Sequence, residues 1–451
     1  MKYHFIGIGG KGMSSIAQYV KMQGYEVTGS DRYYDRGEHL EIFEKLMMLG
    51  IKIYPQDGSG IHQDTTRVII SSAIEKTNLD MVKGIQLSIP ISKRAELLGE
   101  ILNNSSNGIA VGGTSGKTTV VGMLATLLEE TGLMPTAFLG GDLINNYHQQ
   151  FTGNLLMGDN NYLCIEADES DGTIVYYRPK IGVITNISKD HQEVSKLIPL
   201  FQEYAGNISD ILVINGDCPN CAKINFPGQT ITFGFGENCT VQAKEVIAGR
   251  GSLKFKANET NYQISLWGRH NVENSLAAIG VALALGLSPE ITASSISRFK
   301  GMKRRLELVG VRGGVSFFDD YAHNPQKIQA SILALQGNFP RLIIMLQCHG
   351  YQPTSFMWDE LVDVFATTCR REDLVIIPPI YDVGGTTNRE VSAVGLAETL
   401  TTKGVNGLYF PCREKAGEFI RKVIVPGDCV LVMGARDETL SNFVKELKDN
   451  I

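Results

Sequence analysis

A glycine-rich loop that carries one lysine is the clearest sign of chemistry in this sequence. Residues 112–119 read Gly-Gly-Thr-Ser-Gly-Lys-Thr-Thr, after a short apolar run and before a helical pattern. In such a loop backbone N–H groups cradle phosphates, the lysine reaches the β- and γ-phosphates, and a threonine hydroxyl holds Mg²⁺. The strict pattern has glycine where Val111 stands, and a polar helix cap is the alternative. We predict that ATP binds here, with Lys117 facing solvent and Thr118 on the metal, through Gly113, Thr114, Ser115, Gly116, Lys117, Thr118 and Thr119.

Two polar segments follow later apolar runs, at the place where open α/β sheets bind ligands. Glu166 begins the run Glu-Ala-Asp-Glu-Ser-Asp, which offers carboxylate oxygens for Mg²⁺. Residues 186–191 form a second polar loop, which ends in His191. A solvated turn and a structural histidine are the alternatives. Because both segments follow strands in the same unit as the phosphate loop, a shared site is favoured.

A second glycine motif lies near the N-terminus. Residues 7–12 read Gly-Ile-Gly-Gly-Lys-Gly between a strand-like run and a helical pattern, and Asp31 ends the next predicted strand. Such a loop brings backbone amides to a diphosphate at a helix N-terminus, and the acid takes a ribose hydroxyl. NAD and a UDP-sugar both carry a diphosphate and a ribose, so either could bind such a loop. The structural alternative is a turn that only packs a helix on a strand. An oxidoreductase is disfavoured, because hydride transfer gives no reason for the second nucleotide loop.

Basic residues mark the start of the last third of the chain. Arg304 and Arg305 open it, and Asp319–Pro325 follows a predicted strand there. Residues 269–271, Arg-His-Asn, precede a helix that carries Asn274. A pair of arginines is often only a surface feature, but at a domain boundary it can clamp a phosphate when domains close.

Alternating apolar strands and amphipathic helices must position these groups. The alternation predicts an α/β protein of three domains: a Rossmann-like domain over 1–107, a P-loop domain over 108–300 and a second Rossmann-like domain over 301–451. The polar run 103–108 is the predicted linker, and only residues 230–266 are expected to pair in an antiparallel style. The strands expected to end at site residues are Tyr3–Ile8, Glu26–Gly29, Ile109–Val111, Leu163–Glu166, Ile181–Thr185 and Val315–Asp319.

The composition excludes several classes of protein. The 451 residues are 43% hydrophobic and 20% charged with a net charge of −6, so nothing favours nucleic acid or an anionic membrane as the partner. No apolar run approaches the ~20 residues that span a bilayer, and no signal peptide begins the sequence. We therefore expect a cytoplasmic protein. Cys218 and Cys221 form an isolated CxxC, interpreted as reduced thiols rather than a zinc site.

In their order along the chain, these motifs resemble the Mur ligase family of peptidoglycan synthesis, above all the branch that joins L-alanine to UDP-N-acetylmuramate. The likeness covers nearly the whole chain, and the collinearity of the motifs is more specific than any one of them. The matching stretches are Gly7–Ser14, Gly29–Asp31, Ser71–Ile74, Arg94–Leu98, 112–119, Glu166–Asp171, 186–191, Gly268–Asn274, Arg304-Arg305 and Asp319–Pro325.

This resemblance implies an ATP- and Mg²⁺-dependent ligase that joins a UDP-linked sugar carboxylate to an amino acid or short peptide through an acyl-phosphate. The UDP-substrate would bind through Gly9, Gly10, Gly12, Met13, Ser14, Asp31 and Ser72. A second Mg²⁺ would bind Glu166 and His191, beside the one on Thr118. The resemblance completes the ATP site with Asn271, Asn274, Arg305, Asp320 and His323, and makes Lys117, Glu166, His191 and Arg305 catalytic.

The sequence departs from the family pattern where the amine would be selected. The alanine-adding branch usually has His in place of Ser115, and Gln-Pro-His-Arg-Tyr-Thr-Arg after the strand that ends at Leu346. Residues 347–353 here read Gln-Cys-His-Gly-Tyr-Gln-Pro, so Gly350 and Pro353 replace both arginines. ATP use is unaffected, but the amine stays open. The alternatives are a relative that adds a peptide or uses another carboxylate, and a nucleotide-binding relative without catalysis.

Overall fold

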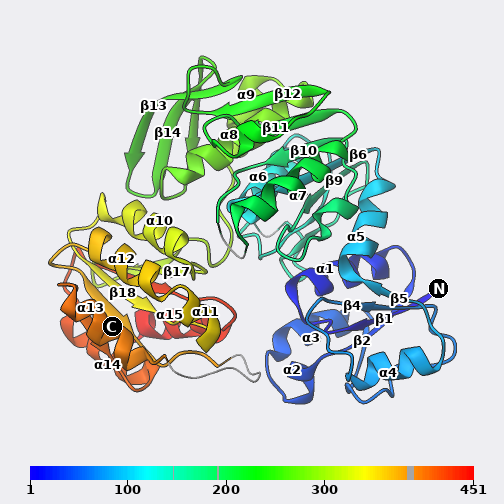
Figure 1. Cartoon of the computed structure of the whole chain (residues 1–451), viewed down its shortest axis with the longest axis horizontal. Coiled ribbons are helices and arrows are strands. Elements are labelled where there is room, and N and C mark those ends of the chain that lie inside the picture. The colour runs from blue at the N-terminus through cyan, green and yellow to red at the C-terminus, as the bar shows by residue number, and fades with distance from the viewer. Residues whose placement is uncertain (146, 190–191, 383–390) are drawn as a thin grey trace. The chain divides into compact units, whose positions relative to one another are not determined.

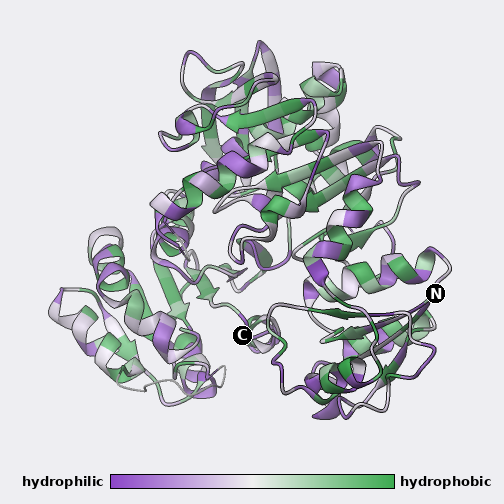
Figure 2. Ribbon diagram, turned by 45° about the vertical axis from the view of Figure 1, so that its right-hand side comes forward, coloured by the Kyte–Doolittle hydropathy of each residue, from purple (hydrophilic) through white to green (hydrophobic). Residues whose placement is uncertain are grey.

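Three β-sheets organise the chain (Figure 1). The structure, a computed structural model, describes residues 1–145, 147–189, 192–382 and 391–451. Hydrophobic residues fill the strands and the helix faces turned toward them, and hydrophilic residues lie on the outer faces (Figure 2). No described helix is both long enough and apolar enough to cross a membrane. The predicted three-domain α/β fold is confirmed.

The first sheet is entirely parallel, in the order β3-β2-β1-β4-β5. Glycines 7, 9 and 10 and the loop after Ile70 follow its neighbouring strands β1 and β4, whose ends are in register at Ile6 and Ile70. Its strands are β1 Lys2–Ile6, β2 Glu26–Ser30, β3 Lys52–Tyr54, β4 Arg67–Ile70 and β5 Ile91–Lys93. Its helices are α1 Lys11–Met22, α2 Arg32–Asp35, α3 Leu40–Met48, α4 Leu79–Gln86 and α5 Arg94–Asn103.

The central sheet has the order β15-β14-β13-β12-β11-β10-β6-β9-β7-β8. Parallel β10, β6 and β9 lie at its middle, so the loops that follow them meet at one edge. Its strands are β6 Asn107–Gly112, β7 Thr136–Phe138, β8 Leu155–Leu156, β9 Tyr162–Glu166, β10 Ile181–Ile184, β11 Ile211–Asn215, β12 Gln229–Gly234, β13 Val241–Gly249, β14 Ser252–Ala257 and β15 Thr260–Ile264. Its helices are α6 Lys117–Glu130, α7 Val194–Gly206, α8 His270–Ala284 and α9 Pro289–Ile296, with 3₁₀ turns η1 Thr173–Tyr176 and η2 Cys221–Lys223.

Two predictions about this sheet need correction. β12 was expected to be antiparallel, but it pairs in parallel with β11 and β13, because alternation of side chains does not fix strand direction. The predicted linker is shorter than expected, since α5 ends at Asn103 and β6 already begins at Asn107.

The third sheet has the order β16-β17-β21-β18-β19-β20. β16 pairs antiparallel with β17, and the other pairs are parallel. Its strands are β16 Glu307–Arg312, β17 Val315–Asp320, β18 Leu342–Leu346, β19 Leu374–Ile377, β20 Gly407–Tyr409 and β21 Cys429–Met433. Its helices are α10 Pro325–Gln336, α11 Tyr351–Phe356, α12 Trp358–Thr368, α13 Ala393–Thr402, α14 Arg413–Val423 and α15 Thr439–Asp449.

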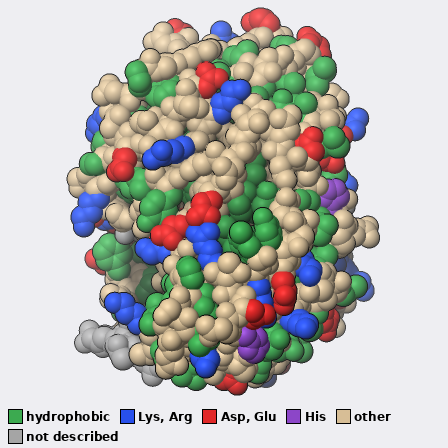
Figure 3. Space-filling view, turned by 90° about the vertical axis from the view of Figure 1, so that its right-hand side faces the viewer, with side chains coloured by type: hydrophobic (Ala, Val, Ile, Leu, Met, Phe, Trp, Pro, Cys, Tyr) green, Lys and Arg blue, Asp and Glu red, His purple; other side chains and the backbone are tan. Residues whose placement is uncertain are grey.

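The chain divides into two compact units. The first unit contains the first sheet and most of the central one, and the second contains residues 303–451 with segments 247–253 and 266–271. Those two segments pack inside the second unit, where the Arg250 guanidinium lies 5.1 Å from the Phe339 ring and Trp267 stacks on Phe339. On the face in Figure 3, acidic and basic side chains are interspersed rather than gathered by sign.

Candidate functional site

The loop between β6 and α6 has a conformation that only its glycines allow. Gly113 and Gly116 have φ of +135° and +88°. A Cβ on Gly113 would collide with the Thr185 hydroxyl, and one on Gly116 with the amide oxygen of Asn274. The backbone can therefore approach closely both the loop after β10 and the first turn of α8.

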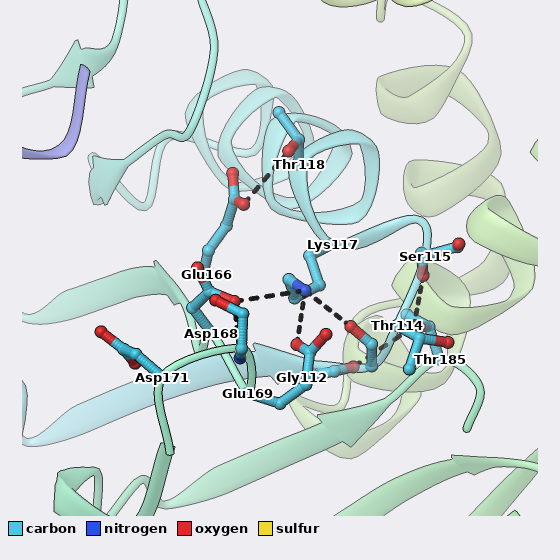
Figure 4. A network of polar contacts seen from close by, with 12 residues as sticks. Gly112, Thr114, Ser115, Lys117, Thr118, Glu166, Asp168, Glu169, Asp171 and Thr185 are labelled. Atoms are coloured by element: carbon cyan, nitrogen blue, oxygen red, sulfur yellow. Dashed lines mark hydrogen bonds and ion pairs between the residues drawn. The ribbon is translucent and has the colours of Figure 1, made fainter. Parts of the chain in front are cut away.

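Lys117 lies at the centre of this loop (Figure 4). Its Nζ donates to the Gly113 carbonyl at 2.8 Å and to Glu169 Oε2 at 2.5 Å, and lies 3.8 Å from Asp168. Burial alone would lower the pKa of Lys117, but Glu169 and Asp168 raise it, so the ammonium is charged. The prediction that Lys117 faces solvent is wrong. Its side chain is only 15% exposed, because it folds back over the loop to these acids.

The acidic residues that follow β9 have different partners. Glu169 is buried, and burial raises its pKa although Lys117 opposes this. Burial would also raise the pKa of Asp168, but Lys117, the Ser170 N–H and Arg94 lower it. Asp171 lies away from Lys117 in Figure 4 and accepts from Thr173 at the start of η1. Sequence reasoning had singled out Glu166 from this run and missed Glu169 as the partner of Lys117.

Thr118 and Glu166 are in direct contact beside the phosphate loop. The Thr118 hydroxyl donates to Glu166 Oε2 at 3.1 Å, and the Gly140 N–H donates to Oε1 at 2.6 Å. Two hard oxygens at the edge of a phosphate loop suit Mg²⁺, which usually takes one or two protein ligands and completes its shell with water and phosphate oxygens. Among the described residues no cluster of three His, Cys, Asp or Glu could hold a metal. Predicted ligand His191 lies outside the described residues.

The loop after β10 clamps the phosphate loop. Asn186 Oδ1 accepts from the Thr114 hydroxyl and the Ser115 N–H at 2.6 and 3.1 Å, and its Nδ2 donates to the Ser115 carbonyl. The Thr185 hydroxyl donates to the same carbonyl at 2.6 Å. Asn186 was noted only as the start of a polar loop, and no sequence signal showed this role. Thr119 is half-buried on the first turn of α6.

The CxxC pair lies beside this clamp. Both cysteines are free, and Cys218 Sγ accepts from the Ile187 N–H at 3.5 Å. A hydrogen bond from Cys221 lowers the pKa of Cys218 and raises that of Cys221.

The N-terminal glycine motif forms the turn between β1 and α1. Gly10 caps α1, and Asp31 accepts from the Gly9 N–H and the Tyr33 N–H, both at 2.9 Å. Burial raises the pKa of Asp31, and these two hydrogen bonds oppose it. The Gly12 Cα faces the Arg94 guanidinium, since an added Cβ would lie 3.0 Å from Nη1. Ser72 is exposed in the loop after β4, the strand next to β1.

Two of the predicted UDP-substrate residues lie in the first turn of α1. Met13 and Ser14 are buried. The Ser14 hydroxyl accepts from Asn154 Nδ2 at 2.9 Å, and Gln18 on the same helix donates to Thr152 at 2.6 Å. These hydrogen bonds hold α1 against the central sheet.

In the second unit, the predicted ATP residues gather around Tyr321. The guanidinium carbons of Arg304 and Arg305 lie 5.1 and 5.2 Å from its ring centroid, and the His323 ring packs edge-on against it at 5.6 Å. Asp320 is buried, and its carboxylate accepts hydrogen bonds from the Leu306 N–H and the Ser331 hydroxyl.

The predicted adenine-side residues begin α8. Asn271 is buried and its Nδ2 donates to the Trp267 carbonyl at 2.7 Å, whereas Asn274 lies against Gly116 of the phosphate loop. The first unit thus combines a phosphate cradle, a charged lysine and a hydroxyl–carboxylate pair. This combination suits transfer of a phosphoryl group, since it places positive charge and metal ligands where negative charge develops.

Family models match the chain in three consecutive parts. Residues 2–106 match "Mur ligase family, catalytic domain", residues 111–282 "Mur ligase middle domain" and residues 304–436 "Mur ligase, glutamate ligase domain". UDP-N-acetylmuramate–L-alanine ligase of Agathobacter rectalis is 33% identical, over 96% of this chain and 95% of its own. The enzyme of that name from Aquifex aeolicus is also 33% identical, over 99% and 98%.

Solved structures share the fold. UDP-N-acetylmuramate–alanine ligase from Thermotoga maritima has a TM-score of 0.82 at 24% identity, covering 100% of both chains. A murein peptide ligase from Psychrobacter arcticus has a TM-score of 0.69 at 22% identity, covering 99% of this chain and 98% of its own.

Proposed function

The chain belongs to the Mur ligase family, whose members are ATP-dependent ligases, and we propose that it joins L-alanine to the carboxylate of UDP-N-acetylmuramate. The full-length likeness to ligases of that name supports this substrate pair. The observation that carries the phosphoryl-transfer step is the charged Lys117 in a glycine loop, next to the Thr118–Glu166 pair.

The reaction takes two steps. A carboxylate oxygen attacks the γ-phosphorus of ATP and ADP leaves, which gives an acyl-phosphate. The neutral amine then attacks the acyl carbon, phosphate leaves, and the nitrogen loses a proton. One Mg²⁺ held by Thr118 and a second held by Glu166 and His191 would neutralise phosphate charge. Lys117 binds the β- and γ-phosphates once they replace Glu169 as its partner.

The UDP-substrate is proposed to bind at the glycine loop of the first sheet, at Gly9, Gly10, Gly12, Asp31 and Ser72. Arg94 supports this placement, because its guanidinium faces Gly12 and its charge also acts on Asp168 beside Lys117. One residue thus links the two glycine loops. A carboxylate delivered from the first loop would arrive near the γ-phosphate held by the second.

Each of the three domains is proposed to bind one substrate. We propose UDP-substrate binding by residues 1–107, ATP binding by 108–300 and amine binding by 301–451, with Asn271, Asn274, Arg305 and His323 completing the ATP site. Because ATP and UDP-sugars are cytoplasmic metabolites, we place the enzyme there.

A second candidate is a ligase of the same family that adds a short peptide. Gly350 and Pro353 favour it, since neither can supply the forked hydrogen bonds by which arginine holds a small substrate's carboxylate.

Phosphate release from ATP, with detection of the amide product by mass spectrometry, tests the proposal. The panel combines UDP-N-acetylmuramate or UDP-N-acetylglucosamine with L-alanine, glycine, L-serine or a tripeptide. We expect a product only when UDP-N-acetylmuramate is present, with L-alanine preferred. A preference for the tripeptide would select the second candidate, and tight NAD(H) binding without any amide would overturn both.

A further inference from the structure

The loop after β21 occupies the middle of the second unit's sheet edge. β21 lies between β17 and β18. The Gly434 N–H donates to the Asp320 carbonyl at 3.1 Å, and the Gln347 N–H donates to the Met433 carbonyl at 2.9 Å. Residues 434–436 are therefore held between the carboxyl ends of both neighbouring strands, where open α/β sheets bind ligands.

Arg436 has a strained backbone at this place. Its φ is +64°, in the left-handed region that glycine adopts without cost. The Arg436 N–H donates to the Tyr321 hydroxyl at 3.3 Å, and the Asp437 N–H closes a tight turn on the Ala435 carbonyl at 2.8 Å. Glycine would make the same turn more easily, and strained backbone of this kind clusters at ligand-binding sites.

The charge of Arg436 is available for a ligand. The side chain is exposed and makes no hydrogen bond or ion pair with any residue that the structure describes. The acids that follow it have other partners, since Asp437 lies 3.2 Å from Arg413, and Glu438 lies 3.8 Å from Arg304. The loop therefore brings a third arginine close to Tyr321, whose ring Arg304 and Arg305 also contact.

Beside this loop lies a buried acceptor without a donor. Gln347 follows β18, is 7% exposed and lies against Gly434, whose missing Cβ would be 3.5 Å from the Gln347 Cβ. Its Nε2 points to the Pro379 carbonyl at 3.4 Å, whereas Oε1 has no hydrogen-bond partner in the described structure. Buried amide oxygens are normally hydrogen-bonded, so this one can accept a hydrogen bond from a ligand N–H group.

We propose that Arg436 is the receptor for the carboxylate of the amino acid substrate and that Gln347 Oε1 accepts a hydrogen bond from its amino group. An α-amino acid carries both groups, an anion and an N–H donor, whereas a nucleotide phosphate supplies only the anion. The proposal rests on the proposed function and names the residues that replace the two arginines absent at Gly350 and Pro353. Arg436 is then a specificity-determining residue.

The test uses Arg436→Gly in the full-length enzyme, with Arg436→Asn as a second variant because asparagine also tolerates a left-handed backbone. We expect an unchanged or higher melting temperature, since the strain is relieved. The KM for L-alanine should rise roughly 10- to 100-fold, as expected for loss of a charge-assisted pair, while the KM for ATP and for the UDP-sugar stays within about twofold.

The substrate pair L-alanine and L-alaninamide isolates the carboxylate. Wild-type enzyme should prefer L-alanine at least about tenfold in kcat/KM, and both variants should lose that preference. Arg371→Ala is the matched control, because Arg371 is exposed and precedes β19, at the amino ends of the parallel strands and so at the end of the sheet opposite to Arg436. It should leave every constant unchanged.

Each outcome has a defined meaning. An unchanged KM for L-alanine in Arg436→Gly, or a rise confined to ATP, overturns the assignment and leaves the proposed ligase function standing. If wild-type enzyme binds ATP but forms no amide with any amino acid or peptide, the proposed function fails, and this assignment fails with it.

Discussion

At the scale of single residues, the ion pair between Lys117 and Glu169 is the central feature of the phosphate loop. Both side chains are mostly buried, so neither charge is well solvated without the other. A nucleotide phosphate can replace Glu169 as the partner of Lys117, and the pair therefore keeps the lysine charged and close to its place of action. This makes Lys117 both a catalytic and a stabilising residue.

Lys117→Ala should abolish ATP turnover and also destabilise the fold, by about 3 kcal/mol, because Glu169 is left buried and unpaired. The double variant Lys117→Ala/Glu169→Gln should recover most of that stability and none of the activity. Urea unfolding and phosphate release measure the two effects. Equal stability of the single and double variants would show that the unpaired Glu169 carboxylate is not the cause of the loss.

Glu166→Gln should lower activity at limiting Mg²⁺ far more than the control Glu203→Gln. Glu203 is an exposed glutamate in the same unit. The carboxylate of Glu166 lies next to the Thr118 hydroxyl, and an amide is a weaker ligand for a hard cation. Titration of phosphate release with Mg²⁺ should show an apparent affinity at least about tenfold weaker for Glu166→Gln. Matching curves for the two variants would rule out metal binding by Glu166.

At the scale of elements, the contacts of helix α1 explain how the N-terminal glycine loop is held in place. Its N-terminus faces the proposed diphosphate site, and its far side is anchored on the central sheet through Ser14, Gln18 and Asn154. A salt bridge between Lys11 and Asp142, 2.9 Å long, adds to this anchor. The position of the glycine loop therefore depends on residues far along the chain.

Asn154→Ala removes the hydrogen bonds of a fully buried side chain to the Lys11 carbonyl and to Ser14, so it should cost about 1–3 kcal/mol. It should also raise the KM for the UDP-substrate several-fold and leave the KM for ATP unchanged. Thermal unfolding and steady-state kinetics, with exposed Asn225→Ala as the control, measure this. A rise in the KM for ATP alone would show that Asn154 does not support the UDP-substrate site.

Sequence patterns predicted the helices and strands well, but predicted strand direction and side-chain contacts poorly. Glycine spacing and apolar runs located both glycine loops between a strand and a helix, because those signals are local. The parallel direction of β12, the inward turn of Lys117 and its pairing with Glu169 depend on contacts between distant segments. The left-handed backbone of Arg436 is likewise set by its place between two strands. No local pattern encodes such features.

At the scale of the whole molecule, the proposed ATP ligands are divided between the two compact units. Lys117 and Asn274 belong to the first unit, whereas Asn271 and Arg305 belong to the second. The division falls within α8, between Asn271 and Val272, and again at Lys303. An ATP molecule that contacts Lys117 and Arg305 together must fix the distance between the units, and water would then be excluded from the acyl-phosphate.

ATP binding should therefore compact the protein through Arg305. A non-hydrolysable ATP analogue with Mg²⁺ and UDP-N-acetylmuramate is expected to reduce the radius of gyration of wild-type enzyme in small-angle X-ray scattering. Arg305→Ala should still bind the analogue through the first unit, with the affinity reduced roughly ten- to hundredfold by the loss of a charge-assisted contact. At saturating analogue it should not compact, because the phosphate no longer has a partner in the second unit. Arg371→Ala, which changes an exposed arginine of the same unit, should compact like wild type. Full compaction of Arg305→Ala would mean that the second unit closes through other residues, and Arg305 would then lose its proposed place on the nucleotide.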